Sequence, residues 1–106
     1  MIMVNTEKIA GKKIVKTLGL VRGNTIRTRH LGRDIMAGLK HLVGGEIKSY
    51  TQMMSDAREE AIARMIKQAE ELGADAVTNV RFATSMIMQG AAEILCYGTA
   101  VKIEEE

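Results

Sequence analysis

The sequence has no proline and no tryptophan, and its aromatic side chains are two tyrosines and one phenylalanine. Without proline there is no proline-rich linker and no polyproline ligand segment. Cys96 is the single cysteine, which excludes an internal disulfide and every metal motif built on a pair of cysteines. The shortage of aromatic rings leaves little for a surface that stacks nucleic-acid bases, so we do not expect a nucleic-acid partner.

The sequence also lacks a long apolar run. Its longest uncharged stretch, residues 82–92, is too short and too polar to span a bilayer, and the first residues carry too short an apolar run for a signal peptide. We therefore expect a cytoplasmic protein with no membrane partner.

What is present is typical of one small globular domain covering residues 1–106, with 46% hydrophobic and 26% charged residues. Charge is unevenly placed, because residues 1–48 hold ten Lys or Arg against three Asp or Glu, whereas residues 49–106 hold five against ten. This asymmetry indicates either complementary faces within an assembly or a basic surface for an anionic partner. A chain this short has a modest core, so self-association is an open question from the start.

Residues 50–72 carry apolar side chains at a sustained spacing of three and four, which predicts a long amphipathic helix. Ser49 and Gln52 match a capping box at its start, and Gly73 is placed to end it in a left-handed conformation. Residues 33–43 predict a shorter helix of the same kind. Gly44 and Gly45 then form a joint between the two helices, and the alternative is an anion site at the start of the long one.

Two other regions predict strands. Residues 13–29 are rich in β-branched residues and fit one or two strands with a bulge or turn at residues 22–24. Residues 74–88 and 92–103 predict a hairpin, and a three-residue loop, 89–91, places the even-numbered residues of both strands under the long helix. This register pairs Met88 with Ala92, Met86 with Ile94 and Thr84 with Cys96. The odd-numbered face, with Arg81, Glu93 and Tyr97, has the composition of a subunit contact.

The expected fold class is therefore α+β, a small antiparallel sheet covered on one face by a long helix plus a short helix. The order of "GKKIVKTLGLVRG", "RDIMAGLKHLVGGEIKSYTQMMSDAREEAIARM" and "AEELGADAVTNVRF", ending in "YGTAVKI", closely resembles the YbjQ-like family of small prokaryotic proteins, often labelled heavy-metal-binding. The resemblance covers nearly the whole chain. It implies a dodecin-like subunit that assembles into a homopentameric ring. The metal label of the family comes from structural comparison and not from a ligand motif, so no set of site residues transfers.

The candidate metal donors are Cys96 and Met86, which the predicted register places diagonally on the face under the helix. Met53, Met54 or Met65 could reach the same place from the helix. Thiolate and thioether sulfurs suit soft ions such as Cu(I). The alternative is that the eight methionines fill the core of a chain poor in aromatic residues, and that Cys96 is a small buried hydrophobe.

Other residue types give weaker signals. His30 and His41 form no zinc pattern with each other or with Cys96. Arg22, Arg27 and two further arginines, Arg29 and Arg33, form a basic stretch that could hold phosphates or pair with an acidic surface. No catalytic constellation is visible, although a pocket between subunits lined by Arg81, Glu93 and Tyr97 would escape motif analysis.

Taken together, the sequence predicts a homo-oligomeric, cytoplasmic binding protein that is not an enzyme. Its expected ligand is a soft heavy-metal ion, and no other cofactor is predicted. The alternative is an oligomeric scaffold, or an anion-binding or nucleic-acid-binding ring, without a metal role.

Overall fold

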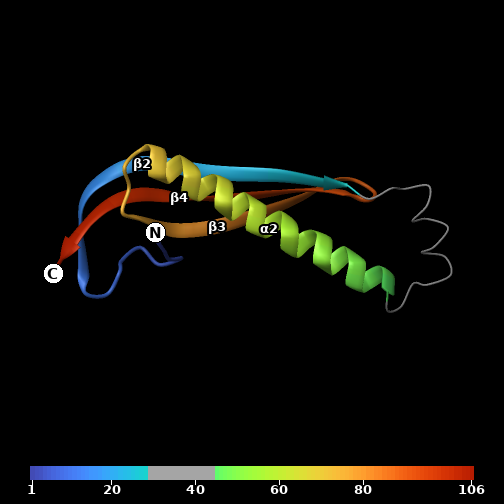
Figure 1. The fold of residues 1–106 in the computed structure, drawn as a ribbon, viewed down its shortest axis with the longest axis horizontal. Coiled ribbons are helices and arrows are strands. Elements are labelled where there is room, and N and C mark those ends of the chain that lie inside the picture. The colour runs from blue at the N-terminus through green and yellow to red at the C-terminus, as the bar shows by residue number, and fades with distance from the viewer. Residues whose placement is uncertain (29–44) are drawn as a thin grey trace.

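The structure is a computed structural model that describes residues 1–28 and 45–106 (Figure 1). Its elements are β1 (Ile2–Met3), β2 (Lys12–Thr28), α2 (Gly45–Glu71), β3 (Ala76–Met88) and β4 (Ala91–Glu105). The four strands form one sheet in the order β1-β3-β4-β2. The α+β class is confirmed. The sheet is mixed and not wholly antiparallel, because the N-terminal segment returns beside β3 as a short parallel strand. The short helix predicted at residues 33–43 lies outside the described residues.

The long helix α2 begins upstream of the predicted start. Ser49 lies inside it, so the predicted capping box is wrong, and Gly45 is its first residue. The predicted end is correct, since Gly73 has a φ of 79°. The Gly73 N–H donates to the Glu70 carbonyl at 2.9 Å and the Ala74 N–H donates to the Ala69 carbonyl at 3.0 Å. These two bonds satisfy carbonyls that the last helical turn leaves without partners. None of the described helical residues makes a segment that is long and apolar enough to cross a membrane.

Strand β2 is one continuous strand, and the turn considered at residues 22–24 is not found. Gly23 pairs with Cys96 in the middle of the antiparallel ladder with β4. The irregularities of β2 lie earlier, where the register shifts between Ile14 and Lys16 and again between Thr17 and Gly19. Gly19 has a φ of 126°, which glycine adopts at much lower cost than other residues.

Helix α2 crosses one face of the sheet (Figure 1) and packs mainly on β2, less on β4 and little on β3. The predicted even-numbered face of β4 is confirmed as the buried one. Small helix residues permit a close approach to the sheet, and the larger core side chains fill the remaining space. The core consists of Val21, Ala57, Ala61, Met65, Ala69, Val77, Val80, Ile94, Cys96 and Ala100.

The hairpin reaches the predicted even-with-even pairing by a different route. Its turn has two residues, Gln89 and Gly90, and Met88 pairs with Ala91. A register shift between Met86 and Met88 then restores the parity, so that Met86 faces Ala92. The predicted pairs of Met88 with Ala92, Met86 with Ile94 and Thr84 with Cys96 are therefore wrong, because a turn plus a bulge replaces the longer loop.

A second bulge divides β3. Thr78 pairs with Thr99 and Arg81 with Tyr97, so Asn79 and Val80 together oppose Gly98. Asn79 has a φ of 53°, in the left-handed region where asparagine is tolerated best after glycine. Before the bulge the odd residue Val77 shares the face of Ala100, and after it the even residue Phe82 shares the face of Cys96. The predicted even-numbered face of β3 is thus correct only beyond the bulge.

The molecule is elongated, with extents of 57 × 22 × 16 Å and a radius of gyration of 17.6 Å. A compact domain of this length has a radius of gyration of about 13 Å. The excess arises because the hairpin extends as a long arm on which α2 covers one face only. The opposite face and the outer edge of β3 beyond its bulge have no cover from the described residues.

Candidate functional site

Two sulfur atoms meet in the core beneath α2. The Cys96 thiol of β4 donates a hydrogen bond to the thioether of Met65 on α2, with 3.5 Å between Sγ and Sδ. Both side chains are completely buried. Burial raises the pKa of the Cys96 thiol, because an apolar environment disfavours the thiolate. The described structure thus holds this cysteine as a neutral thiol beside a second soft donor.

Gly23 of β2 allows this arrangement. It pairs with Cys96 across the ladder and lies directly under the helix. A β-carbon added at Gly23 would stand 2.3 Å from the Ala61 carbonyl oxygen and 2.4 Å from the Met65 nitrogen. The missing side chain lets the helix backbone rest on the strand, which brings Met65 down to Cys96.

Met86, the other predicted donor, does not join this pair. It faces Ala92 near the hairpin turn and is 62% exposed, whereas Cys96 faces Phe82. The four steps along the strand from Phe82 to Met86 correspond to about 13 Å, too far for one ion to contact both sulfurs. The predicted diagonal contact is absent because β3 is shifted by two residues along β4 relative to the predicted register, so that Phe82 and not Thr84 pairs with Cys96. Met65, which was among the helical candidates, takes that place.

Oxygen and nitrogen donors do not gather in the described part of the chain. Within residues 1–28 and 45–106 no group of three His, Cys, Asp or Glu side chains is close enough to hold an ion. His30 and His41, together with Arg29 and Arg33, lie outside the described residues. The sulfur pair is therefore the metal candidate that the geometry offers.

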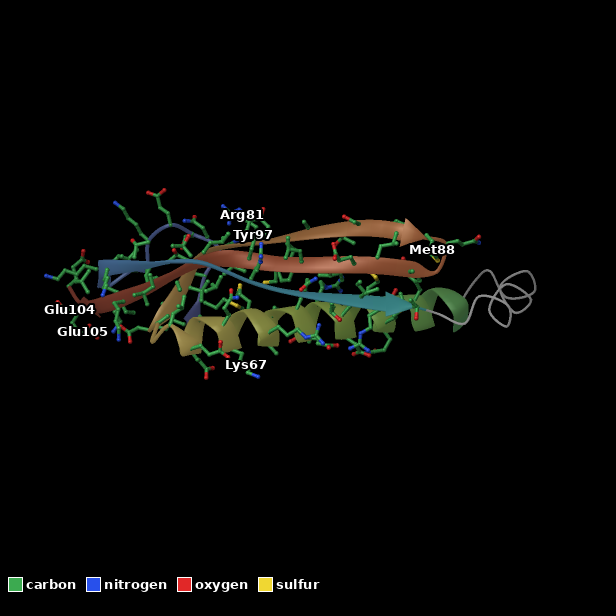
Figure 2. The ribbon with its side chains drawn as sticks, turned by 90° about the horizontal axis from the view of Figure 1, so that it is seen from above. Lys67, Arg81, Met88, Tyr97, Glu104 and Glu105 are labelled. Atoms are coloured by element: carbon green, nitrogen blue, oxygen red, sulfur yellow. The ribbon has the colours of Figure 1, made fainter. Side chains whose placement is uncertain are left out.

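The open face of the sheet carries the second candidate surface. Arg81 of β3 and Arg22 of β2 both pair with Tyr97 of β4, so the three side chains form a row across the sheet. Figure 2 shows Arg81 and Tyr97 on the side opposite the helix, far from Lys67. The Arg81 guanidinium donates to the Asn5 carbonyl at 2.7 Å and to the Val80 carbonyl at 3.1 Å. The predicted common face of Arg81, Glu93 and Tyr97 is thus confirmed, with Glu93 two rows further along that face.

A third feature was predicted only in part: the pairing of the basic stretch with an acidic surface is found at Arg27, whereas the helix contacts to the backbone of β2 were not predicted. One stripe of α2 reaches over the outer edge of β2. The Gln68 side-chain oxygen accepts a hydrogen bond from the backbone N–H of Arg22 at 2.7 Å. The Arg64 guanidinium donates to the backbone carbonyl of Asn24 at 2.6 Å. Glu60 pairs with Arg64 and also with Arg27 of β2. The signal in the sequence is the spacing of residues 60, 64 and 68, each one helical turn from the next.

An open hollow lies where the N-terminal segment meets β3. It adjoins the bulge of β3 and is apolar for most of its surface. It is lined by Met3, Val4, Asn5, Thr6, Val80 and Phe82.

Comparison with known proteins gives concordant matches. A YbjQ family model described as "Putative heavy-metal-binding" matches residues 1–104. A "UPF0145 protein" of Methanosarcina acetivorans is 63% identical over 103 residues, which cover 97% of each chain. A "UPF0145 protein" of Halorubrum lacusprofundi is 64% identical over 99 residues, covering 93% of this chain and 95% of the relative.

One solved structure supports the fold. A protein of unknown function of the DUF74 family from Pediococcus pentosaceus superimposes with a TM-score of 0.67 over 98% of both chains. Its sequence identity to this chain is 18%, so the likeness shows the fold alone.

Proposed function

Since the chain belongs to the family described as "Putative heavy-metal-binding", with close relatives named UPF0145 protein, we propose that it is a homo-oligomeric protein that binds a soft heavy-metal ion through Cys96 and Met65. The single observation that carries the proposal is the buried contact of 3.5 Å between the two sulfurs. Thiolate and thioether donors select Cu(I) over harder ions.

The donor set fits a soft ion and does not fit zinc. A structural zinc site takes four ligands, and the described residues bring no three His, Cys, Asp or Glu side chains together. A bound soft ion supplies the positive charge that stabilises the Cys96 thiolate. Because the thiol must lose its proton on binding and its pKa is raised, metal affinity increases with pH.

Native mass spectrometry with Cu(I) under reducing conditions tests the metal site. We expect one ion per chain on the wild type, none on Cys96→Ala and weakened binding on Met65→Leu. The matched control is Met86→Leu, which changes an exposed methionine of the same sheet and leaves binding intact. A wild type that takes up no stoichiometric Cu(I) contradicts the metal proposal.

Self-association is supported by the shape of the chain. The radius of gyration of 17.6 Å and the uncovered sheet face leave a surface on which further copies could pack. The family resemblance implies a ring of five. Light scattering on the purified protein tests the assembly, and a monomeric mass contradicts it.

A binding role is preferred to catalysis because burial favours the neutral and poorly nucleophilic thiol form of Cys96. Burial raises the pKa of the Cys96 thiol, whereas a catalytic cysteine needs a lowered one. The cytoplasm, where thiols stay reduced, suits a protein with one free cysteine.

An oligomeric scaffold without a metal role is the second candidate. Its specific support is the complete burial of Cys96, since a sealed thiol in contact with methionine is also a normal core arrangement. Stable assembly of the wild type without stoichiometric Cu(I) would select this candidate.

A further inference from the structure

Exposed sheet edges invite pairing with another chain, and proteins guard them with charges, bulges or covering elements. Strand β2, one outer strand of this sheet, is guarded along most of its length. Its first part carries Lys12, Lys13 and Lys16 and contains both register shifts. In its second part the outward N–H of Arg22 and the outward carbonyl of Asn24 are bonded to side chains of α2. These two backbone groups are therefore not free to pair with a neighbouring strand.

The outer edge of β3 is covered by another segment only at its start, and beyond that its one irregularity is the register shift between Met86 and Met88 near the turn. The Val4 N–H donates to the Val77 carbonyl at 3.0 Å, and the Val80 N–H donates to the Val4 carbonyl at 3.1 Å. The Asn79 N–H donates to the Thr6 carbonyl at 3.0 Å. Residues 2–6 thus cover β3 up to its bulge. The chain then turns away, and residues 82–88 have no described neighbour on this side.

The amino-acid composition of this uncovered segment favours pairing with a strand of another chain. Residues 82–88, "FATSMIM", carry no charge, no proline and no glycine, and every one of them is exposed. Phe82, Met86, Ile87 and Met88 are among the large hydrophobic residues exposed on the molecule. A segment of this kind at a free edge aggregates unless another strand covers it.

We propose that residues 82–88 of β3 pair with the same residues of a second copy, edge to edge and antiparallel, so that the two sheets become continuous. The occupant is the same segment of a second copy. The described edge of β2 is guarded along most of its length, so residues 82–88 are the free edge that each copy offers to the other. An uncharged strand brought against itself meets no like-charge repulsion. A two-fold contact uses the same surface on both copies, which makes the two strands antiparallel.

This inference rests on the proposed self-association and specifies one of its contacts. A two-fold contact joins copies in pairs, so it doubles the number of chains in any ring that other surfaces build. Phe82 already lines the hollow formed with residues 3–6, and a second strand paired beside it would extend the wall of that hollow.

Light scattering on the full chain with charged variants at Ser85, the middle of the segment, tests the pairing. Lysines from two copies would lie on neighbouring positions of the paired strands, so we expect Ser85→Lys to halve the mass of the wild-type assembly. Ser85→Glu should do the same. Mixing the two variants should restore the wild-type mass, because opposite charges then meet.

The matched control is Ile26→Lys. Ile26 and Ser85 both pair with Glu93, so the two residues lie on the same row and face of the sheet but at opposite edges. Ile26→Lys should leave the mass unchanged. An oligomeric wild type whose mass survives Ser85→Lys overturns the edge pairing and leaves the proposed function standing. A monomeric wild type overturns both, and Cu(I) uptake, which involves neither residue, is read independently.

Discussion

Gly23 of β2 lies directly beneath Ala61 of α2, so close that a β-carbon on Gly23 would stand 2.3 Å from the Ala61 carbonyl oxygen. The contact is between two backbones, with no flexible side chain to yield. It sets the height of the helix above the sheet, and the positions of Met65, Arg64 and Gln68 follow from that height.

Replacing Gly23 with alanine should therefore lower the free energy of unfolding strongly. The added methyl group collides with helix backbone, and overpacking of a core contact costs about 2–3 kcal/mol. Urea denaturation followed by circular dichroism measures the change. Ile26→Ala, which shortens an exposed side chain on the same strand, should cost much less. Equal losses in the two variants would show that the helix is not held at this point.

Replacing Gln68 with alanine should free the edge of β2. The Arg22 N–H loses its acceptor at 2.7 Å, and a hydrogen bond of this kind contributes about 1 kcal/mol. Amide hydrogen exchange at Arg22 should become faster while exchange in the centre of β4 is unchanged. Lys67→Ala, on the outer side of the helix (Figure 2), serves as the control and should leave the Arg22 exchange rate as it is.

Replacing Glu60 with glutamine should weaken the link between α2 and β2. The carboxylate pairs with both Arg27 and Arg64, and all three side chains are partly exposed, so the loss should be about 0.5–1 kcal/mol and smaller at high salt. Thermal unfolding at low and high salt measures it. The neighbouring Glu59→Gln should change stability less, and a loss that does not depend on salt would argue against an ionic origin.

Stability should decline in alkali because of Cys96. Burial raises its pKa in the folded state above the ordinary 9.0, so the folded state binds more protons than the unfolded state once the pH exceeds that value. The contribution is complete below the unfolded pKa and is lost as the pH rises through the folded one. Urea midpoints across this range should fall in the wild type and fall less in Cys96→Ala. A thiol reagent should label Cys96 slowly in the folded chain and rapidly in urea.

The sequence patterns predicted best what depends on local spacing. The presence of a long helix over residues 50–71 and its end before Gly73 follow from apolar periodicity and from the conformational freedom of glycine. The buried face of β4 follows from strict alternation. The start of α2 was misplaced because Ser49 and Gln52 satisfy a capping pattern that is equally compatible with the interior of a helix.

Contacts between distant segments could not be predicted in the same way. The exposure of Met86 depends on where α2 crosses the sheet, and that is decided by the close approach at Gly23. The partner of Cys96 depends on the same crossing, since the sequence offers no reason to choose among the three helix methionines that could reach it. The parallel pairing of β1 leaves no periodic signal, because β1 is only two residues long.

The bulge at the left-handed residue Asn79 interrupts the alternation of side chains along β3. From Arg81 to Met86, where the second register shift begins, each residue presents its side chain to the opposite side from the one that uninterrupted alternation would give, and this shift places Arg81 on the open face beside Tyr97. Straightening the bulge while keeping both of its residues would exchange the two sides of this part of the strand. Arg81 would turn toward the helix and Phe82 away from it, so a single backbone conformation decides which chemistry the arm of this molecule offers to its surroundings.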